Sequence, residues 1–165
     1  MTSEEFTNGH PALAQFWHPV ALSSEVGREP AAGRLGGRSW ALARFSGGIA
    51  AFADACPHRR ARLSAGQVTG GTLQCPYHGW QFTPDGRCVN IPALEDNAAI
   101  PERATLHRPA EVAEQDGMVW LAPEPPRAPI PDLHPAVPRC WRGAGPDPIS
   151  SGACLRPDDR EVPWL

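Results

Sequence analysis

The sequence predicts an all-β fold followed by an irregular tail. Beyond Trp17, the apolar residues fall in short runs separated by turn-forming Gly, Pro, Asp and Ser, a pattern typical of all-β domains. After Pro123, neither the strand period nor the helix period can be recognised. With 165 residues, the chain is long enough for one domain with a substantial core and some additional sequence.

The expected elements follow one another from the N-terminus. Residues 1–15 form a polar lead-in with at most one helical turn near 12–15, and the first strand begins at Trp17. Several hairpins follow, each marked by glycine in its turn. Their turns are Ser46-Gly47-Gly48 between segments 40–45 and 49–53, Gly70-Gly71 before segment 72–75, Pro84-Asp85-Gly86 between 80–82 and 88–90, and Gln115-Asp116-Gly117 between 110–114 and 118–122.

The last segment, residues 124–165, differs in composition from the rest. It holds ten of the chain's twenty prolines and three of its sixteen glycines. Proline and glycine together make up 13 of its 42 residues, which exceeds the level of about 25–30 % associated with disordered chain. We therefore divide the chain into a lead-in (1–15), a domain (16–123) and a proline-rich tail (124–165) that we expect to be loosely ordered.

Composition excludes several classes of function. The net charge is −3, with fifteen arginines, no lysine and eighteen acidic residues, which gives no indication of binding to nucleic acid or to an anionic membrane. No run approaches the roughly 18 apolar residues of a membrane span, and the acidic N-terminus lacks the apolar region of a secretory signal. We expect a cytoplasmic protein in which Cys88, Cys140 and Cys154 are reduced thiols.

Two short motifs predict a metal centre. They are Cys56-Pro57-His58 and Cys75-Pro76-Tyr77-His78, which spell C-x-H, sixteen residues, then C-x-x-H. Thiolates suit iron–sulfur clusters and zinc, and imidazoles suit iron, zinc and copper. A zinc finger usually has both cysteines in one knuckle and both histidines in the other. Here each motif carries one of each, which favours the Rieske [2Fe–2S] arrangement of two Cys on one iron and two His on the other. A structural zinc site is the alternative.

The residues around these motifs closely resemble the Rieske domain of the aromatic-ring-hydroxylating, non-haem iron oxygenases. The first loop reads Cys-Pro-His-Arg-Arg-Ala-Arg-Leu-Ser over 56–64, and the second reads Cys-Pro-Tyr-His-Gly-Trp over 75–80. Segments 17–21, 82–86, 91–92 and 111–120 resemble further strands and turns of that family. Two positions depart from its pattern, because Arg60 stands where Gly is common and Arg62 where Pro is common.

The resemblance implies a Rieske-type antiparallel β-sandwich over 16–123 and a Rieske-type [2Fe–2S] cluster. Its four ligands would be Cys56, His58, Cys75 and His78. By the same resemblance, both cysteines lie inward and both histidines face solvent, while Trp80 either shields the cluster or is an ordinary core aromatic.

Two properties of the centre are also expected. High-potential Rieske proteins have a disulfide that braces the two loops, but Tyr77 stands where one of its cysteines would be. We therefore expect a potential toward the low end of the range of roughly −150 to +300 mV. We further expect the ligand–metal bonds to bridge two loops that otherwise lack a core.

An oxygenase of this family also has a second domain, in which two His and one carboxylate hold a mononuclear iron. The other histidines, His10, His18, His107 and His134, do not show the paired spacing of that site. We therefore expect an electron-transfer domain, a truncated or remnant α subunit that hydroxylates nothing by itself. Its expected partners are a reductase or ferredoxin as electron donor and an oxygenase catalytic domain or subunit as acceptor. The alternatives are a stand-alone Rieske ferredoxin and a zinc-stabilised interaction module.

Overall fold

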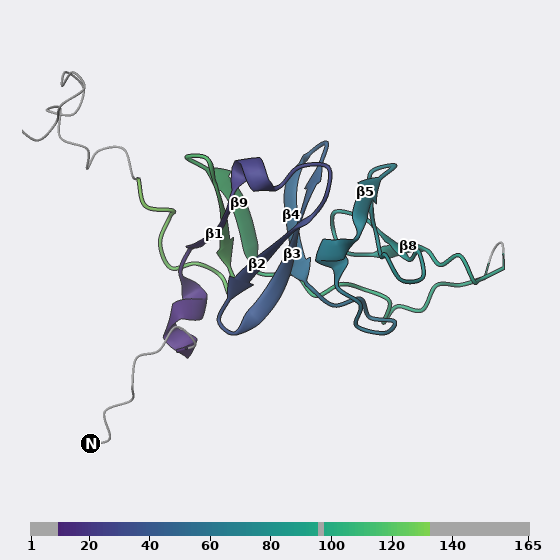
Figure 1. Cartoon of the computed structure of the whole chain (residues 1–165). Helices are drawn as coiled ribbons and strands as arrows, with labels where there is room; N and C mark the ends of the chain where they lie inside the picture. The colour runs from purple at the N-terminus through teal and green to yellow at the C-terminus, as the bar shows by residue number, and fades with distance from the viewer. Residues whose placement is uncertain (1–9, 96–97, 133–165) are drawn as a thin grey trace, which may run out of the picture. The chain divides into compact units, whose positions relative to one another are not determined.

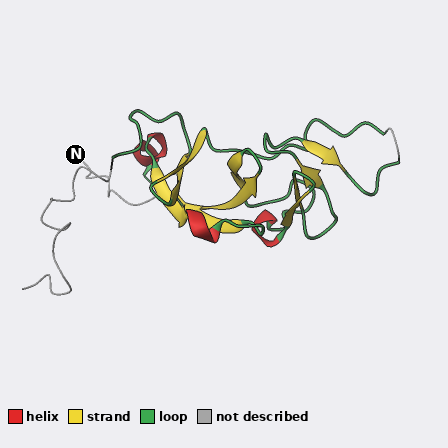
Figure 2. Cartoon of the chain, turned by 90° about the horizontal axis from the view of Figure 1, so that it is seen from above, coloured by secondary structure: helices red, strands yellow, loops and turns green. Residues whose placement is uncertain are grey.

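The computed structural model describes residues 10–95 and 98–132. Contacts separate residues 1–130 from the rest of the chain, and all but two of the described residues belong to this first unit. This part contains strands and three short 3-10 helices (Figures 1 and 2). In chain order the elements are η1 (Pro11–Gln15), β1 (His18–Leu22), η2 (Ser23–Glu25), β2 (Ala31–Leu35), β3 (Arg38–Phe45), β4 (Gly48–Ala53), η3 (Leu63–Ala65), β5 (Gln67–Thr69), β6 (Thr72–Gln74), β7 (Gln81–Phe82), β8 (Cys88–Asn90), β9 (Glu111–Gln115) and β10 (Met118–Ala122).

The strands form three antiparallel sheets, which confirms the all-β prediction. Their strand orders are β1-β10-β9, β2-β3-β4 and β5-β6-β7-β8. Most neighbouring strands are consecutive hairpins, but β1 pairs with the distant β10, with His18 opposite Leu121. This pairing closes the domain, because it joins the first strand to the last.

The predicted hairpins are confirmed by the strand registers. Phe45 lies opposite Gly48, Thr69 opposite Thr72, and Gln115 opposite Met118. Gly70 and Gly71 have φ values of 55° and 76°, the left-handed backbone that a tight two-residue hairpin turn requires. The structure adds β2, which sequence analysis missed although the Gly36-Gly37 pair marks its turn into β3.

Strand β3 is buried on both faces and separates two apolar cores. Successive side chains of a strand point to opposite faces. Trp40 and Leu42 face the first core, which also contains Val119 and Leu121 of β10. The intervening Ala41, Ala43 and Phe45 face the second core, which is shared with the third sheet. In Figure 1, β3 and β4 accordingly lie between the β1 and β9 strands on one side and β5 and β8 on the other.

The second core surrounds the bases of both predicted ligand loops. Phe52, Leu73 and Phe82 are fully buried there, and Cys56 and Cys75 belong to the same cluster. Burial of each such aliphatic or aromatic side chain contributes about 1.5–3 kcal/mol. The expectation that the loops lack a core is therefore wrong, because apolar side chains from β4, β6 and β7 converge beneath them.

The lead-in and the start of the predicted tail lie side by side. Helix η1 confirms the predicted helical turn before Phe16. The backbone N–H of Glu124 donates to the Ala14 carbonyl at 2.9 Å, and that of Arg127 donates to the Gln15 carbonyl at 3.0 Å. The rest of the predicted tail, from residue 133, lies outside the described residues, and its boundary stays a prediction. Within the described part of the chain, no helix has the length and apolarity needed to cross a bilayer.

Candidate metal centre

The two ligand loops begin where β4 and β6 end, as the sequence predicts, and they have the same backbone hydrogen bonds. In each loop the cysteine N–H donates to the carbonyl five residues later, and the cysteine carbonyl accepts from the N–H four residues later. The bonds are Cys56 N to Ala61 O (2.9 Å), Arg60 N to Cys56 O (2.8 Å), Cys75 N to Trp80 O (2.8 Å) and Gly79 N to Cys75 O (3.1 Å). The two loops thus present their cysteines from equivalent turns.

The fourth residue after each cysteine has a left-handed backbone. In the second loop this residue is Gly79, with φ of 71°, and a Cβ placed there would lie 3.2 Å from the Pro92 side chain. In the first loop it is Arg60, with φ of 56°. A residue other than glycine costs roughly 1–2 kcal/mol in this conformation. Arg60, which departs from the family pattern, therefore also has a strained backbone.

Both candidate cysteines are buried. Cys56 is 1 % exposed and Cys75 is 3 % exposed. The pKa of the Cys56 thiol is raised to about 11, chiefly by burial and also by the neighbouring Cys75 thiol. Backbone hydrogen bonds from His58 and Arg59 lower this pKa, because they stabilise the thiolate. A metal that binds here must displace a proton, and it finds backbone donors already directed at one sulfur.

Both candidate histidines are exposed, which confirms the expected orientation of the four side chains. The ring centroids of His58 and His78 lie 4.6 Å apart, with an angle of 61° between the rings. Local desolvation lowers the pKa of His58, and repulsion from His78 and Arg59 lowers it further. This shift favours the neutral imidazole, the form that binds metal.

Aromatic side chains hold the two imidazoles. Trp80 stacks on His58, with ring centroids 4.9 Å apart and 4° between the planes. Trp80 is half-buried and packs against the second core, so it contacts both that core and the His58 ring. Tyr77 lies against His78 with centroids 3.8 Å apart.

These donors fit a two-metal cluster better than a single ion. They divide into a buried thiol pair and an exposed imidazole pair, which matches the Rieske arrangement of two Cys on one iron and two His on the other. A structural zinc ion instead needs about four donors around one point. Among residues 10–95 and 98–132, no three His, Cys, Asp or Glu side chains converge in that way.

Asp54 holds the first loop in place, a role that sequence analysis did not assign. Its carboxylate is buried and accepts hydrogen bonds from the Ser64 N–H at 2.8 Å, the Ser64 hydroxyl at 2.7 Å and the Ser39 hydroxyl at 3.4 Å. The loop from 55 to 63 is thereby closed at its base. The sequence offered one signal for this role, a carboxylate directly after the apolar segment 49–53. A charged group that is buried at such a position needs hydrogen-bond donors around it.

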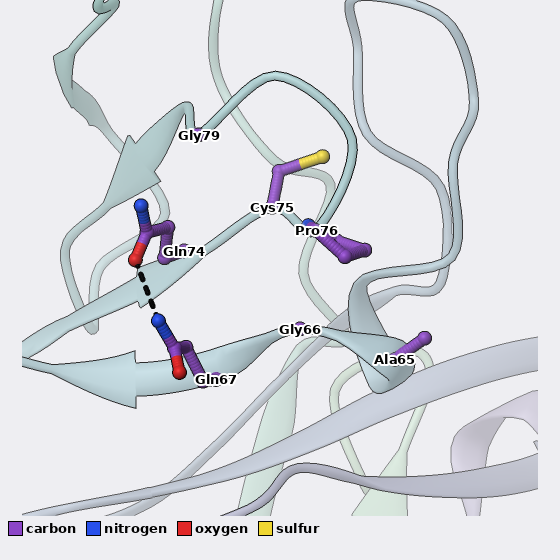
Figure 3. A pocket seen from close by; sticks show the side chains of 7 residues that line it. All are labelled: Ala65, Gly66, Gln67, Gln74, Cys75, Pro76 and Gly79. Atoms are coloured by element: carbon purple, nitrogen blue, oxygen red, sulfur yellow. Dashed lines mark hydrogen bonds between the residues drawn. The ribbon is translucent and has the colours of Figure 1, made fainter.

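A cavity of about 320 Å³ lies beside the second loop (Figure 3). It is lined by Ala65, Gly66, Gln67, Gln74, Cys75, Pro76 and Gly79. The Gln67 amide donates to the Gln74 side chain at 2.9 Å, and in Figure 3 the Cys75 sulfur points away from this pair. The cavity touches one of the four candidate ligands, so it does not enclose the predicted centre.

The other histidines and cysteines that the structure describes have structural surroundings. His10 accepts from the Ala12 N–H at 3.2 Å and caps η1, and His18 lies 2.7 Å from the Leu13 carbonyl. His107 lies against Trp40, with ring centroids 6.0 Å apart. The half-buried Cys88 thiol donates to the Asn90 carbonyl at 3.5 Å. His134, Cys140 and Cys154 lie outside the described residues.

Comparisons with known proteins agree with this geometry. The sequence profile described as "Rieske [2Fe-2S] domain" matches residues 16–115. Methylxanthine N1-demethylase NdmA of Pseudomonas putida is 37 % identical over 115 residues, which cover 66 % of this chain and 32 % of that protein. The oxygenase component of dicamba O-demethylase from Stenotrophomonas maltophilia is 37 % identical over 134 residues, which cover 78 % of this chain and 39 % of that protein.

A solved structure of NdmA from Pseudomonas putida CBB5 superposes with a TM-score of 0.67 at 35 % identity, and covers 72 % of this chain and 37 % of that one. The chain therefore spans about a third of the length of these relatives, and what it shares with them is the Rieske domain of oxygenase α subunits. This protein belongs to the Rieske [2Fe–2S] domain family, and its cofactor is a Rieske-type [2Fe–2S] cluster.

Proposed function

We propose that this chain is an electron-entry domain that transfers one electron at a time. In this proposal, Cys56 and Cys75 bind one iron of the cluster, and His58 and His78 bind the other. The observation that carries the proposal is the division of the four donors into a buried thiol pair and an exposed imidazole pair on two equivalent loops. The cluster supplies one-electron redox chemistry, while the chain provides its ligands and surroundings.

The residues around the donors have separate tasks. Phe52, Leu73 and Phe82 exclude water from the sulfur side, since all three are fully buried in the core that contains the thiols. Backbone N–H groups of the first loop stabilise the Cys56 thiolate. Trp80 keeps the His58 ring in one orientation by stacking on it. The imidazole edges face solvent, which is the side from which an electron can enter or leave.

The proposed partners follow from this exposed edge. The donor is a reductase or a ferredoxin, and the acceptor is an oxygenase catalytic domain or subunit. A potential toward the low end of the Rieske range belongs to the same proposal, because Tyr77 takes the place of a bracing cysteine and Cys88 lies outside the loops. A cytoplasmic location is also proposed, although some relatives are named as chloroplastic proteins.

The experiment that tests this function measures the ligands directly. The purified chain should contain two irons and two inorganic sulfides and should be red-brown. Labelling histidine with ¹⁵N should alter the nitrogen couplings in the electron spin resonance spectrum of the reduced protein. Cys56→Ser, Cys75→Ser, His58→Ala and His78→Ala should each lose the colour, whereas Cys88→Ser should keep it. A colourless Cys88→Ser protein, or a spectrum without nitrogen couplings, would contradict the ligand assignment.

A further inference from the structure

A cavity of about 330 Å³ lies between the segment before the first strand and the segment after the last. Its walls come from η1, the start of β1, the β2–β3 hairpin, His107 and the residues that follow β10. None of the four candidate cluster ligands is among the described residues that line it. The volume is at the lower end of the roughly 300–1,000 Å³ that small-molecule sites occupy. This part of the domain can thus accommodate a compact molecule away from the metal centre.

The most buried side chain of the wall is that of Trp40. It is 1 % exposed and belongs to the first core. Among residues 10–95 and 98–132, no acceptor lies within hydrogen-bond distance of its Nε1–H. Buried polar groups in proteins nearly always have a partner, because a donor that leaves water without one is destabilised. An acceptor on a molecule in the adjoining cavity would supply this partner.

Arg38 adds a positive charge to the same wall. Arg38 and Trp40 lie two residues apart in β3, so their side chains point to the same face of the sheet, and both line the cavity. Arg38 is exposed, and it takes part in neither of the two ion pairs found in the described part of the chain. Together the two side chains offer a neutral donor and a cation, from which the two oxygens of one carboxylate can accept.

The acceptors on the wall already have donors beside them. The Leu13 carbonyl lies 2.7 Å from His18 Nε2. The Glu124 carboxylate accepts from the Gln15 side-chain amide at 3.3 Å. Because Glu124 repels an anion, a negatively charged group should lie beside Arg38 instead. The unmet requirement of this cavity is therefore an acceptor that carries negative charge.

The rest of the wall is mainly apolar. Aliphatic side chains of η1, of β2 and of the segment after β10 line the cavity, namely Pro11, Leu13, Leu35 and Pro123. Burial of apolar ligand surface against such side chains is favourable. Three histidines also line the cavity, yet no three His, Cys, Asp or Glu side chains in the described ranges are placed to hold a metal ion. The wall therefore suits an organic anion and not a metal.

We propose that this cavity binds a small monocarboxylate with a compact apolar body. The carboxylate accepts from the Trp40 Nε1–H and pairs with the Arg38 guanidinium, while the body lies against Leu13 and Leu35. Binding is non-covalent, and no electron or proton is transferred. The inference goes beyond the proposed function and does not depend on the cluster.

Binding should also fasten the lead-in to the segment after β10. Ala14 and Glu124 both line the cavity, and the Glu124 N–H donates to the Ala14 carbonyl at 2.9 Å. A ligand that contacts both segments stabilises the state in which this bond is closed, by mass action. Exchange of the Glu124 amide proton with solvent should therefore slow when the ligand binds.

The test titrates the purified, cluster-loaded chain with cyclohexanecarboxylate in a calorimeter at low salt. Cyclohexanecarboxamide keeps the body without the charge, and acetate keeps the charge without the body. The carboxylate should bind with a Kd of about 1 mM or lower, as a molecule of this size can achieve, and both comparison probes should bind at least about five-fold more weakly. Absence of binding at about 10 mM, as for a cavity that holds only water, would overturn the proposal. Equal affinity for either comparison probe would overturn it as well.

Matched variants locate the binding site. Ala14→Leu places a larger side chain in the cavity and should weaken binding at least about ten-fold, whereas Ala12→Leu, at an exposed position outside the wall, should leave it unchanged. Arg38→Gln should weaken binding about three- to five-fold, whereas Arg34→Gln, exposed on the neighbouring β2, should leave it within about two-fold. Equal effects within either pair would refute the site.

The Trp40 indole provides a direct signal of binding. Its ¹H–¹⁵N resonance, assigned with Trp40→Phe, should move to higher frequency when the carboxylate binds, because the N–H gains an acceptor. If Trp40→Phe does not fold, replacement of each other tryptophan assigns the resonance by elimination. Exchange of the Glu124 amide should slow, while that of Thr83, which donates to the Arg87 carbonyl in a remote turn, should not change. An indole resonance that does not move would contradict the proposal.

Iron and visible absorbance are measured for the parent chain and every variant. A colourless parent chain would contradict the proposed function. A coloured chain that does not bind the carboxylate would contradict the cavity site alone.

Discussion

Replacing Arg60 by glycine should stabilise the domain. Arg60 has a φ of 56°, and its backbone N–H donates to the Cys56 carbonyl, a bond that glycine can also make. Release of the left-handed strain contributes about 1–2 kcal/mol. The greater freedom of glycine in the unfolded chain costs about 0.5–1 kcal/mol. The midpoints of these two ranges differ by about 0.75 kcal/mol, which is the expected net gain in the free energy of unfolding.

Urea unfolding followed by circular dichroism measures this gain, with Arg60→Ala as the matched control. Alanine removes the charge but keeps the strain, so its stability should stay close to that of the parent. Gly79→Ala tests the equivalent position in the other direction, because it introduces strain and places a Cβ 3.2 Å from Pro92. It should lose at least about 1 kcal/mol. If Arg60→Gly and Arg60→Ala unfold at the same urea concentration, backbone strain is not what distinguishes residue 60.

Four further predictions concern the metal centre, its core and two carboxylates. Cys56→Ser should lose iron and visible absorbance but retain the far-ultraviolet circular dichroism of the folded sheets, because the second core also contains apolar side chains from three strands; loss of the β-sheet signal together with the colour would contradict this independence. Phe82→Ala should lower the free energy of unfolding by about 3–5 kcal/mol in urea titrations, since the ring is fully buried; a loss below about 1 kcal/mol would count against that packing. Asp54→Asn should lower the free energy of unfolding by about 1–3 kcal/mol and increase the rate of iron loss to a chelator, because the amide cannot accept the full set of hydrogen bonds that closes the first loop. An iron-loss rate equal to that of the parent would contradict the role of Asp54 in holding this loop. The pKa of the Glu114 carboxyl lies below its usual value, chiefly because the Arg44 guanidinium donates a hydrogen bond to it. This pair therefore stabilises the fold at pH values above the pKa of the unfolded chain, and its contribution disappears as the pH falls through the pKa of the folded protein. Arg44→Leu should raise the pKa of Glu114 in an NMR titration, and an unchanged pKa would contradict the pairing.

The sequence alone was sufficient to predict the all-β class and the principal hairpins and to indicate the chemistry of the site, because these features depend on local signals. The orientation of the four candidate ligands was implied by the family resemblance. Turn residues such as Gly70-Gly71 encode a backbone conformation directly, and two motifs that each carry one thiol and one imidazole restrict the chemistry of the site. Family membership then confirmed the nature of the cofactor.

Tertiary structure decided the remaining features, because they depend on contacts between residues far apart in the chain. The pairing of β1 with β10 joins residues about 100 positions apart, and no local pattern specifies it. To predict that β3 is buried on both faces, one has to know which residues pack on each face. The sequence does not give this information, and the ligand loops were therefore wrongly expected to lack a core. The equivalence of the two ligand loops was shown only by their backbone hydrogen bonds and dihedral angles, because arginine at position 60 and glycine at position 79 do not indicate equivalent positions. The strain at Arg60 follows from the same comparison.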